Sequence, residues 1–312
     1  MRIATYNVEW FSNLFDRNGR MLEDGEWSSR YKVTRAEQLG ALGIVFTAMD
    51  ADLVMVIEAP DNNRQRQTVP MLESFAARYG LRQRKALLGF DSSLKIDLDV
   101  DAQLDLVTYS KPPLEVALQT REGRDLRLIG VHIKSKAPHG ATTPEAATRL
   151  AIENRRKQLA QSIWLRRRVE RHLDGGDSVI VLGDFNDGPG LDEYEKLFGR
   201  SSIEIVLGEG GPPERRLRDP HARLSSAHST AASATSARFY NAEERQYFSA
   251  MLDYVMLSPD LCTAMPEWRI WHPFDDPACY RTPELREALL QASDHFPVSV
   301  DLSLCQGRVG AL

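Results

Sequence analysis

Cysteine and long apolar stretches are both scarce in this sequence of 312 residues. Its three cysteines, Cys262, Cys279 and Cys305, are odd in number and lack metal-ligand spacing, which argues against a disulfide framework and favours a reducing compartment. No apolar run approaches the roughly 20 residues that a membrane span needs. The opening MRIATYNVEWF lacks the apolar core and cleavage site of a signal peptide. We therefore expect a soluble cytoplasmic protein that does not contact a membrane.

An excess of basic charge is also missing, because 44 acidic residues outnumber 39 basic ones and the net charge is -5. A simple DNA-coating role is thereby disfavoured, although a bound metal and a few arginines can reverse the potential inside a cleft. Hydrophobic residues at 42% and charged residues at 27% are typical of a globular protein with an ample core. No repeat, dividing linker or partner-binding segment is visible. We expect one domain over residues 1–312 and a monomer.

Short apolar runs, each bounded by polar or turn residues, predict buried strands. They are residues 2–8, 52–58, 104–110, 126–133, 178–185, 252–258 and 297–304. Apolar residues at near-helical spacing predict helices at 34–49, 69–79 and 145–173. Interleaved strands and helices predict an α/β or α+β protein with sheets at its centre. A Gly/Pro turn followed by small polar residues predicts a mobile loop at 208–237.

The strongest local signal is VIVLGDFNDGPG, residues 179–190, in which an apolar strand runs into Asp184 and Asn186. Side chains alternate along a strand, so these two lie on one side of it. A carboxylate and a carboxamide there can bind a hard cation and orient a water molecule. The alternative is an ordinary turn, since Asp, Asn and Gly are turn formers.

Two further segments near the C-terminus contain polar residues next to apolar runs. In ASDHFPVSVDL an Asp294–His295 pair precedes a strand, and in MLDYVMLS Asp253 lies inside one. A carboxylate buried without a partner costs several kcal/mol or becomes neutral. Asp253 therefore needs a cation or an imidazole, and His295 is a candidate. An Asp that orients a histidine and stabilises its charged form is a known catalytic arrangement.

Three more polar residues interrupt apolar strands: Asn7 in ATYNVEW, Glu58 in VMVIEAPDN and His132 in LIGVHIKSK. Each alone could be a cap or a turn residue. A core rarely tolerates polar residues in six separate strands unless the strand ends converge on one site. We expect that convergence.

In their order along the chain, these motifs resemble those of the endonuclease/exonuclease/phosphatase superfamily, the group with the deoxyribonuclease I-like fold. GDFND, LDYV and SDHFPV carry the resemblance most specifically, and HIKSK is similar to a segment of bacterial nuclease-like members. The resemblance extends from ATYNVEW to SDHFPV, nearly the whole chain. It implies a four-layer α/β sandwich of two packed mixed β-sheets flanked by helices, with the site at one edge.

The resemblance also implies roles for these residues. Glu58 would be the principal metal ligand, supported by Asn7 and Asp294. Asp184 and Asn186 would position or deprotonate the attacking water and hold the phosphate. His132 and His295 would contact phosphoryl oxygens, and Asp253 would orient His295. Oxygen and amide ligands without cysteine suit Mg²⁺ or Mn²⁺, or Ca²⁺, rather than zinc.

The sequence departs from the family pattern at two positions. Ile57 stands before Glu58 where members often have Gln, and Lys111 stands where an Arg is usual. Neither position carries a group that the mechanism requires. Both departures argue against transferring the substrate of any single relative to this chain.

These features predict a divalent-metal-dependent phosphodiesterase or nuclease, with nucleic acid as the favoured substrate. Lys134, Lys136 and Arg155 follow the His132 strand and could meet a phosphate backbone. The first alternative is a phosphatase or phosphodiesterase acting on a small or lipid-derived phosphate. The remote alternative is a catalytically silent protein that binds phosphorylated partners.

Several other features favour structural explanations. Asp97, Asp99 and Asp101 have the spacing of a calcium loop but lack its glycine and glutamate, so a solvated loop or edge strand fits better. His221 and His228 lie in the predicted loop and are interpreted as bystanders, the alternative being that this loop covers an active site. Trp268 and Trp271 are interpreted as packing residues, with base stacking as the alternative.

Overall fold

The structure is a computed structural model, and it describes most of the chain. The described residues are 1–89, 93–96, 105–109, 111–138, 140–188, 199–224, 234–241 and 245–304. All the strands and helices predicted from the sequence are present, with ends that agree to within three residues. Asp97, Asp99, Asp101 and His228 lie outside the described residues.

The first of two central sheets joins both ends of the chain. Its order is β11 (Glu267–Ile270), β12 (Val298–Asp301), β1 (Arg2–Asn7) and β2 (Leu53–Ile57). β1 runs parallel to β2 and antiparallel to β12. The parallel pair brings the C-terminal ends of β1 and β2, and with them Asn7 and Glu58, to the same edge.

The second central sheet has the order β10 (Asp253–Leu257), β7 (Val179–Asp184), β6 (Asp125–His132) and β5 (Leu114–Gln119). β6 and β7 are parallel, whereas β10 and β5 run antiparallel to their neighbours. Two further pairs are separate two-stranded sheets: β3 (Ser93–Ile96) with β4 (Asp105–Thr108), and β8 (Ala237–Asn241) with β9 (Gln246–Ala250).

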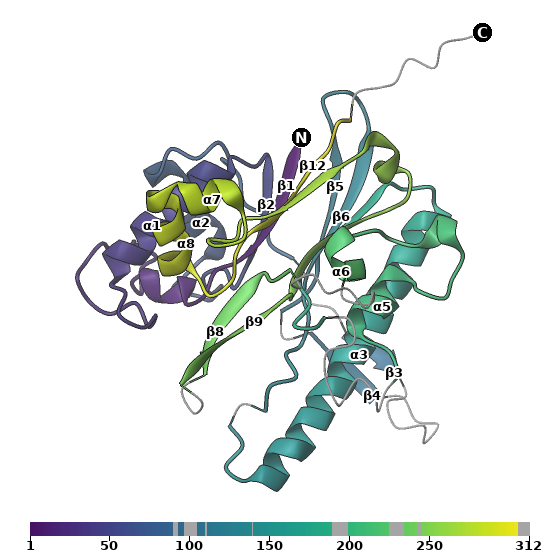
Figure 1. Ribbon diagram of the computed structural model, residues 1–312, viewed down its shortest axis with the longest axis horizontal. Coiled ribbons are helices and arrows are strands. Elements are labelled where there is room, and N and C mark those ends of the chain that lie inside the picture. Colours follow the sequence, from purple (N-terminus) through teal and green to yellow (C-terminus); the bar gives the residue numbers. More distant parts are fainter. Residues whose placement is uncertain are drawn as a thin grey trace.

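Helices cover the outer face of each central sheet (Figure 1). The first sheet is covered by α1 (Arg35–Met49), α2 (Thr68–Arg78), α7 (Pro277–Arg281) and α8 (Pro283–Ala292). The second is covered by α3 (Pro144–Asp174), α5 (Ser202–Leu207) and α6 (Pro220–Leu224). Short 3-10 turns lie at η1 (Phe11–Leu14), η2 (Pro213–Arg215) and η3 (Leu261–Ala264). None of the described helices is long and apolar enough to cross a membrane.

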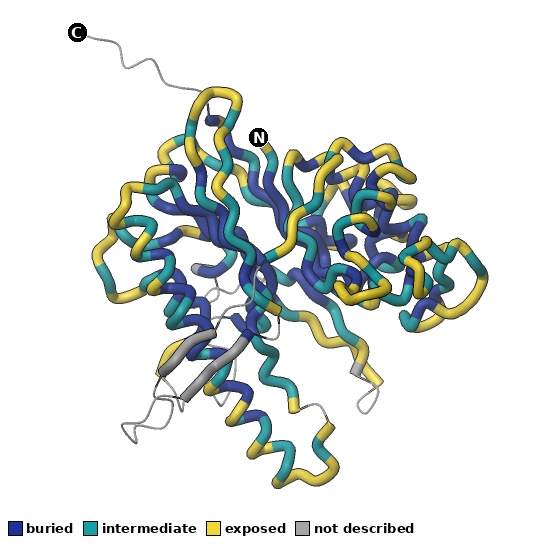
Figure 2. Tube along the Cα trace, turned by 180° about the vertical axis from the view of Figure 1, so that it is seen from behind, coloured by how far each residue is buried: buried dark blue, intermediate teal, exposed yellow. Residues whose placement is uncertain are grey.

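Alternation of side chains along the strands produces the four layers. In β7, Val179 and Val181 pack against the helices of their sheet, whereas Ile180 and Leu182 pack between the two sheets. In β1, Tyr6 faces the α1 side and Ile3 faces the other sheet. The predicted α/β sandwich of two packed mixed sheets flanked by helices is confirmed. Figure 2 shows the strands as the buried centre of the molecule.

The prediction of a mobile loop at 208–237 is wrong for much of that segment. Residues 208–224 include η2 and α6. Arg166 of α3 donates hydrogen bonds to the carbonyl oxygens of Leu207, just before this segment, and of Arg215 within it. Ser236 is buried and β8 begins at Ala237. Residues 225–233 lie outside the described residues. The Gly/Pro turn hid short elements whose neighbourhood includes buried apolar side chains, Leu217 and Ala222 among them.

Candidate active site

Pairing between strands brings the predicted polar residues of the second sheet together. Asp184 at the end of β7 is in register with His132 on β6 and with Asp253 on β10. His295 lies just before β12 in the first sheet. The fold therefore brings these strand-end residues together at one edge of the sandwich, as expected.

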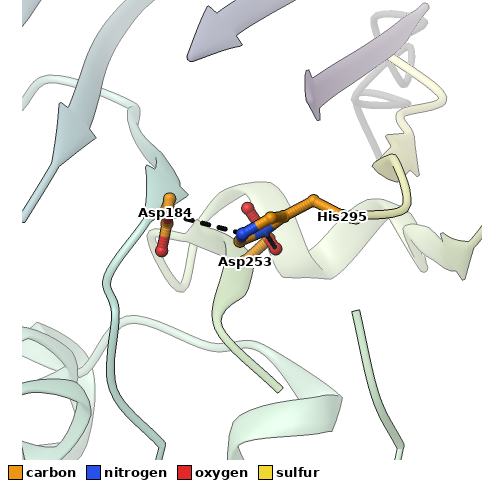
Figure 3. Close-up of side chains that lie close together, drawn as sticks. All are labelled: Asp184, Asp253 and His295. Atoms are coloured by element: carbon orange, nitrogen blue, oxygen red, sulfur yellow. Dashed lines mark hydrogen bonds and ion pairs between the residues drawn. The ribbon is translucent and has the colours of Figure 1, made fainter. Parts of the chain in front are cut away.

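Asp253 and His295 form a buried hydrogen-bonded pair across the two sheets (Figure 3). Nδ1 of His295 lies 2.7 Å from Oδ2 of Asp253. Burial alone would favour the neutral imidazole, but the charges of Asp253 and Asp184 outweigh it and raise the pKa of His295 to about 10. The imidazole is therefore held in its charged form at neutral pH.

Ser236 completes this pair, and nothing in the sequence pointed to it. Its hydroxyl donates to Oδ2 of Asp253 at 2.8 Å and accepts from the backbone N–H of Asp253 at 2.9 Å. The residue is fully buried. A serine within a run of small polar residues has no distinguishing signal, so only the three-dimensional contact reveals it.

Side chains from three other strand ends surround Oδ2 of Asp184. It accepts a hydrogen bond from Nδ2 of Asn7 at 2.9 Å and lies 3.7 Å from Nε2 of His132 and 4.0 Å from Nε2 of His295. Burial, with the nearby charge of Asp253, raises the pKa of Asp184 to about 7. A carboxylate that takes up a proton near neutral pH has the property required of a general base.

His132 has an electrostatic setting opposite to that of His295. Burial and the positive charge of Lys111 lower the pKa of His132 to about 3, so its ring is neutral at physiological pH. The site therefore holds one charged and one neutral imidazole, and both present Nε2 towards Asp184.

The loop after β7 holds Asn186 in a left-handed conformation, with φ of 50°. Its backbone N–H donates to Oδ1 of Asp184 at 2.7 Å, and its carboxamide donates to the carbonyl of Ile133 at 3.1 Å. Gln158 of α3 donates to the carbonyl of Asn186 at 3.0 Å. Gly183 is required before this loop, because a Cβ there would lie 1.9 Å from the carbonyl oxygen of Val131.

Oxygen ligands for a cation are present next to this cluster. Oδ1 of Asn7 is buried and has no hydrogen-bond partner among the described residues, which is the situation that a bound cation would relieve. Glu58 follows β2 with φ of 57° and lies 3.5 Å from Nζ of Lys111. Burial raises the pKa of Asp294, and the charge of Glu58 adds to that rise. These oxygen donors suit a hard divalent cation.

A second set of atoms, on Asp184, Asp253 and His295, also lies close enough to hold a metal ion, all within 4.8 Å of one another. Oδ2 of Asp253 already accepts hydrogen bonds from Ser236 and His295, whereas its Oδ1 has no partner among the described residues. The charged imidazole of His295 beside these oxygens repels a cation. This trio fits proton chemistry better than it fits a cation.

The three basic residues predicted to bind substrate have different positions. Lys134 is half-buried beside the His132 strand, and Nζ of Lys136 lies 2.9 Å from Oδ1 of Asp187. Arg155 is fully buried, and its guanidinium donates to Oδ2 of Asp187 at 2.7 Å. The expectation that Arg155 meets a substrate is wrong, because it lies on the inward face of α3 beneath the loop that holds Asn186.

Three residues for which the sequence favoured structural explanations lie outside the site. His221 lies on α6, with Nδ1 3.3 Å from Asp219. Trp271 is buried and donates to the hydroxyl of Ser299 at 3.0 Å, and Trp268 donates to the carbonyl of Val255 at 2.7 Å. The interpretation of both tryptophans as packing residues is confirmed.

The family model of the endonuclease/exonuclease/phosphatase family matches residues 4–295. The chain belongs to that family. Its members are phosphoester hydrolases that use divalent metal ions, and this chain is a hydrolase of that type. Membership of this family defines the reaction class, whereas the geometry of the site bears on the substrate.

Solved structures similar to this chain include a beta toxin from Staphylococcus aureus, with 12% identity, a TM-score of 0.50, and 97% of this chain and 99% of the other covered. An AP endonuclease from Archaeoglobus fulgidus has 13% identity and a TM-score of 0.45, with coverages of 97% and 100%. A mannosyl-6-phosphatase from Bacteroides thetaiotaomicron has 13% identity and a TM-score of 0.44, with coverages of 97% and 99%. No curated protein matches the chain in sequence. The beta toxin likeness shows a shared fold.

Proposed function

We propose that this member of the endonuclease/exonuclease/phosphatase family is a phosphodiesterase that hydrolyses nucleic acid by in-line attack of water. The observation that carries the proposal is the arrangement around Asp184, whose Oδ2 lies within 4.0 Å of Nε2 of both His132 and His295. A carboxylate between two imidazoles can accept the proton of a water molecule while the rings hold the anionic oxygens of the ester.

Each residue then has a distinct part in the step. Asp184 orients the water and takes its proton, and Asn186 helps to hold the phosphate. His295, kept charged by Asp253, donates a hydrogen bond to a phosphoryl oxygen as negative charge develops on it. His132 donates from a neutral ring to another oxygen. The new P–O bond forms from the water as the bond to the leaving oxygen breaks opposite it.

We assign the cation to Asn7, Glu58 and Asp294, and propose Mg²⁺ or Mn²⁺, with Ca²⁺ as a weaker substitute. When bound, the cation would offset the negative charge that makes a phosphodiester resist attack. The unpartnered Oδ1 of Asn7 supports this assignment. So does the position of Glu58, which directly follows Ile57, the residue paired with Asn7 on the neighbouring strand.

Nucleic acid is favoured as the substrate by the basic residues beyond His132. Lys134 and Lys136 follow β6, and the exposed Arg156 lies on α3. Lys136 is paired with Asp187, so Lys134 and Arg156 are the cations proposed to contact a sugar-phosphate backbone.

A second candidate is a small or lipid-derived phosphodiester. A cavity of about 980 Å³ reaches from Glu58, Lys111 and His132 along apolar residues that include Met55 and Leu128. A largely apolar pocket beside a phosphoester site could take an apolar alcohol group of an ester.

Turnover of a single-stranded oligonucleotide, a duplex and an aryl phosphodiester, each with Mg²⁺ or Mn²⁺, tests these proposals. We expect chelation to abolish turnover and either cation to restore it. Asp184→Asn and His295→Ala should each reduce the rate by roughly 10²–10⁴ while circular dichroism shows an intact fold. Full activity in either variant would remove the assignment. Oligonucleotide affinity that does not fall with added salt would favour the second candidate.

A further inference from the structure

The β8–β9 hairpin starts inside the active site. Ala237, its first residue, forms a β-bridge with His295, and the backbone N–H of Arg238 donates to the carbonyl of Asp294 at 2.7 Å. The ring of Phe239 lies edge-on to the imidazole of His295, with centroids 5.5 Å apart. A substrate held at His295 must therefore lie next to this hairpin.

Beyond Phe239 the hairpin presents aromatic rings to solvent. Tyr240 is 52% exposed, Tyr247 is 56% exposed, and their rings pack edge to face with centroids 5.2 Å apart. Phe248 is exposed as well. Figure 1 shows the hairpin projecting from the sandwich below the two central sheets, and Figure 2 shows how exposed it is. An isolated two-stranded hairpin gains little stability in water, so exposed rings on it call for a functional reason.

A ring from a distant part of the sequence faces the hairpin. Tyr31, in the segment before α1, is 75% exposed and stacks with Tyr240, the two rings being 14° from parallel with centroids 6.5 Å apart. Two nearly parallel, exposed rings side by side form a platform on which a planar base can stack.

Positive charges accompany these rings. The guanidinium of Arg238 lies 4.0 Å from the ring centroid of Tyr247, and Nζ of Lys32 lies 5.1 Å from that of Tyr31. Stacking rings interleaved with cations are the usual means of binding single-stranded nucleic acid, because the rings take the bases and the cations take the phosphates. A lipid surface would instead favour apolar tips that insert between acyl chains.

We propose that Tyr31, Tyr240 and Tyr247 form a base-stacking surface that binds unpaired bases beside the scissile phosphate, which makes single-stranded nucleic acid the preferred substrate. The proposal rests on the proposed function. It adds to that function that the enzyme recognises the bases of its substrate. Recognition of this kind requires a single strand. A base within a duplex has both faces covered by its neighbours and cannot use these rings.

The test compares Tyr240→Ala and Tyr247→Ala with Tyr280→Ala. Tyr280 on α7 is a matched control, since it is 54% exposed and has the guanidinium of Arg286 5.3 Å from its ring. Kinetics are measured on single-stranded oligothymidylate, on the same strand in a duplex, and on methyl 4-nitrophenyl phosphate. We expect the hairpin variants to raise KM for the single strand by about fivefold or more. Hydrolysis of the small ester should be unchanged, and Tyr240→Phe should behave like the wild type.

Binding provides a readout that does not depend on turnover. Fluorescence anisotropy of labelled oligothymidylate is recorded with Mn²⁺ in the Asp184→Asn background, with and without Tyr240→Ala. Weaker binding in the double variant supports the stacking surface, and equal binding overturns it. If the wild type cleaves oligonucleotides and the hairpin variants match it, the inference fails while the proposed function stands.

Cleavage of the small ester alone, without cleavage of any oligonucleotide, would contradict the proposed function, and the binding comparison would still decide the role of the hairpin. Sedimentation with phosphatidylcholine vesicles is the remaining arm. Vesicle binding that Tyr240→Ala and Tyr247→Ala abolish, with no oligonucleotide binding, would overturn the proposal in favour of a membrane surface.

Discussion

Carboxyl groups in this protein behave differently because their surroundings differ. Burial, together with the negative charge of the nearby Asp253, raises the pKa of Asp184 to about 7. Asp260, after β10, has the opposite behaviour. Burial opposes its ionisation, but hydrogen bonds from Ser178, Ser258 and Arg124 outweigh that effect and lower its pKa below 3.8. The first environment prepares a carboxylate for proton transfer, and the second fixes a charge that stabilises the fold.

Replacement of Asp260 by Asn should therefore destabilise the protein in a pH-dependent way. A group whose pKa is lower in the folded state contributes stability above its unfolded pKa of 3.8, and that stability is lost as pH falls through the folded value. We expect urea unfolding to separate wild type and Asp260→Asn at pH 7 and to bring the two progressively together as pH falls below 3.8. A gap of constant size at every pH would contradict this, and Asp61→Asn on the exposed surface is the control.

At the scale of elements, α3 shows how neighbouring residues on one helix take unrelated roles. Arg155 is fully buried and paired with Asp187, whereas Arg156 is exposed. Successive residues on a helix point in different directions, so the basic character of the segment does not indicate which arginine faces solvent. Arg155 and Gln158 hold the loop that follows β7, and so they support Asn186 from below.

Paired substitutions on α3 test this difference. Arg155→Met leaves the buried Asp187 without a main partner and should cost about 3–5 kcal/mol in the free energy of unfolding. Arg156→Met, one residue further on, should change it by less than about 0.5 kcal/mol. Denaturant unfolding of both variants measures the difference, and similar stabilities would show that the Arg155–Asp187 contact contributes little.

At the scale of the whole molecule, the hydrophobic cluster between the two sheets brings residues near both ends of the chain together. The cluster between the sheets includes Ile3 of β1, Leu182 of β7 and Val300 of β12. The N-terminal amino group donates to the carbonyl of Leu302 at 2.9 Å. Neither sheet can form its inner face alone, because each depends on apolar side chains of the other.

We propose a single domain and expect it to unfold as one cooperative unit. Tryptophan fluorescence should report both halves, because Trp164 lies on α3 and Trp271 is buried against the first sheet. The transition followed by fluorescence and the one followed by far-UV circular dichroism should coincide in denaturant. Two separated transitions would show that the sheets fold independently.

Much of the site could be predicted from sequence because its residues stand at the ends of apolar strands. Asp184 and His132 end parallel neighbours, and Asp253 begins the strand on the other side, so pairing alone brings them together. The roles of Ser236 and Tyr240 were not predictable. Ser236 acts through one hydroxyl contact, and Tyr240 is significant because Tyr31 stacks with it from over 200 residues away.

The amino-acid sequence by itself determined the order of strands and helices and the polar residues that interrupt them, because apolar periodicity is a local property. The tertiary structure alone decided three other matters: that Ser236 bonds to Asp253 beside His295, that Arg155 points inward, and that aromatic rings flank the site. Each of these depends on how the elements pack, since contacts between residues distant in the chain leave no local pattern.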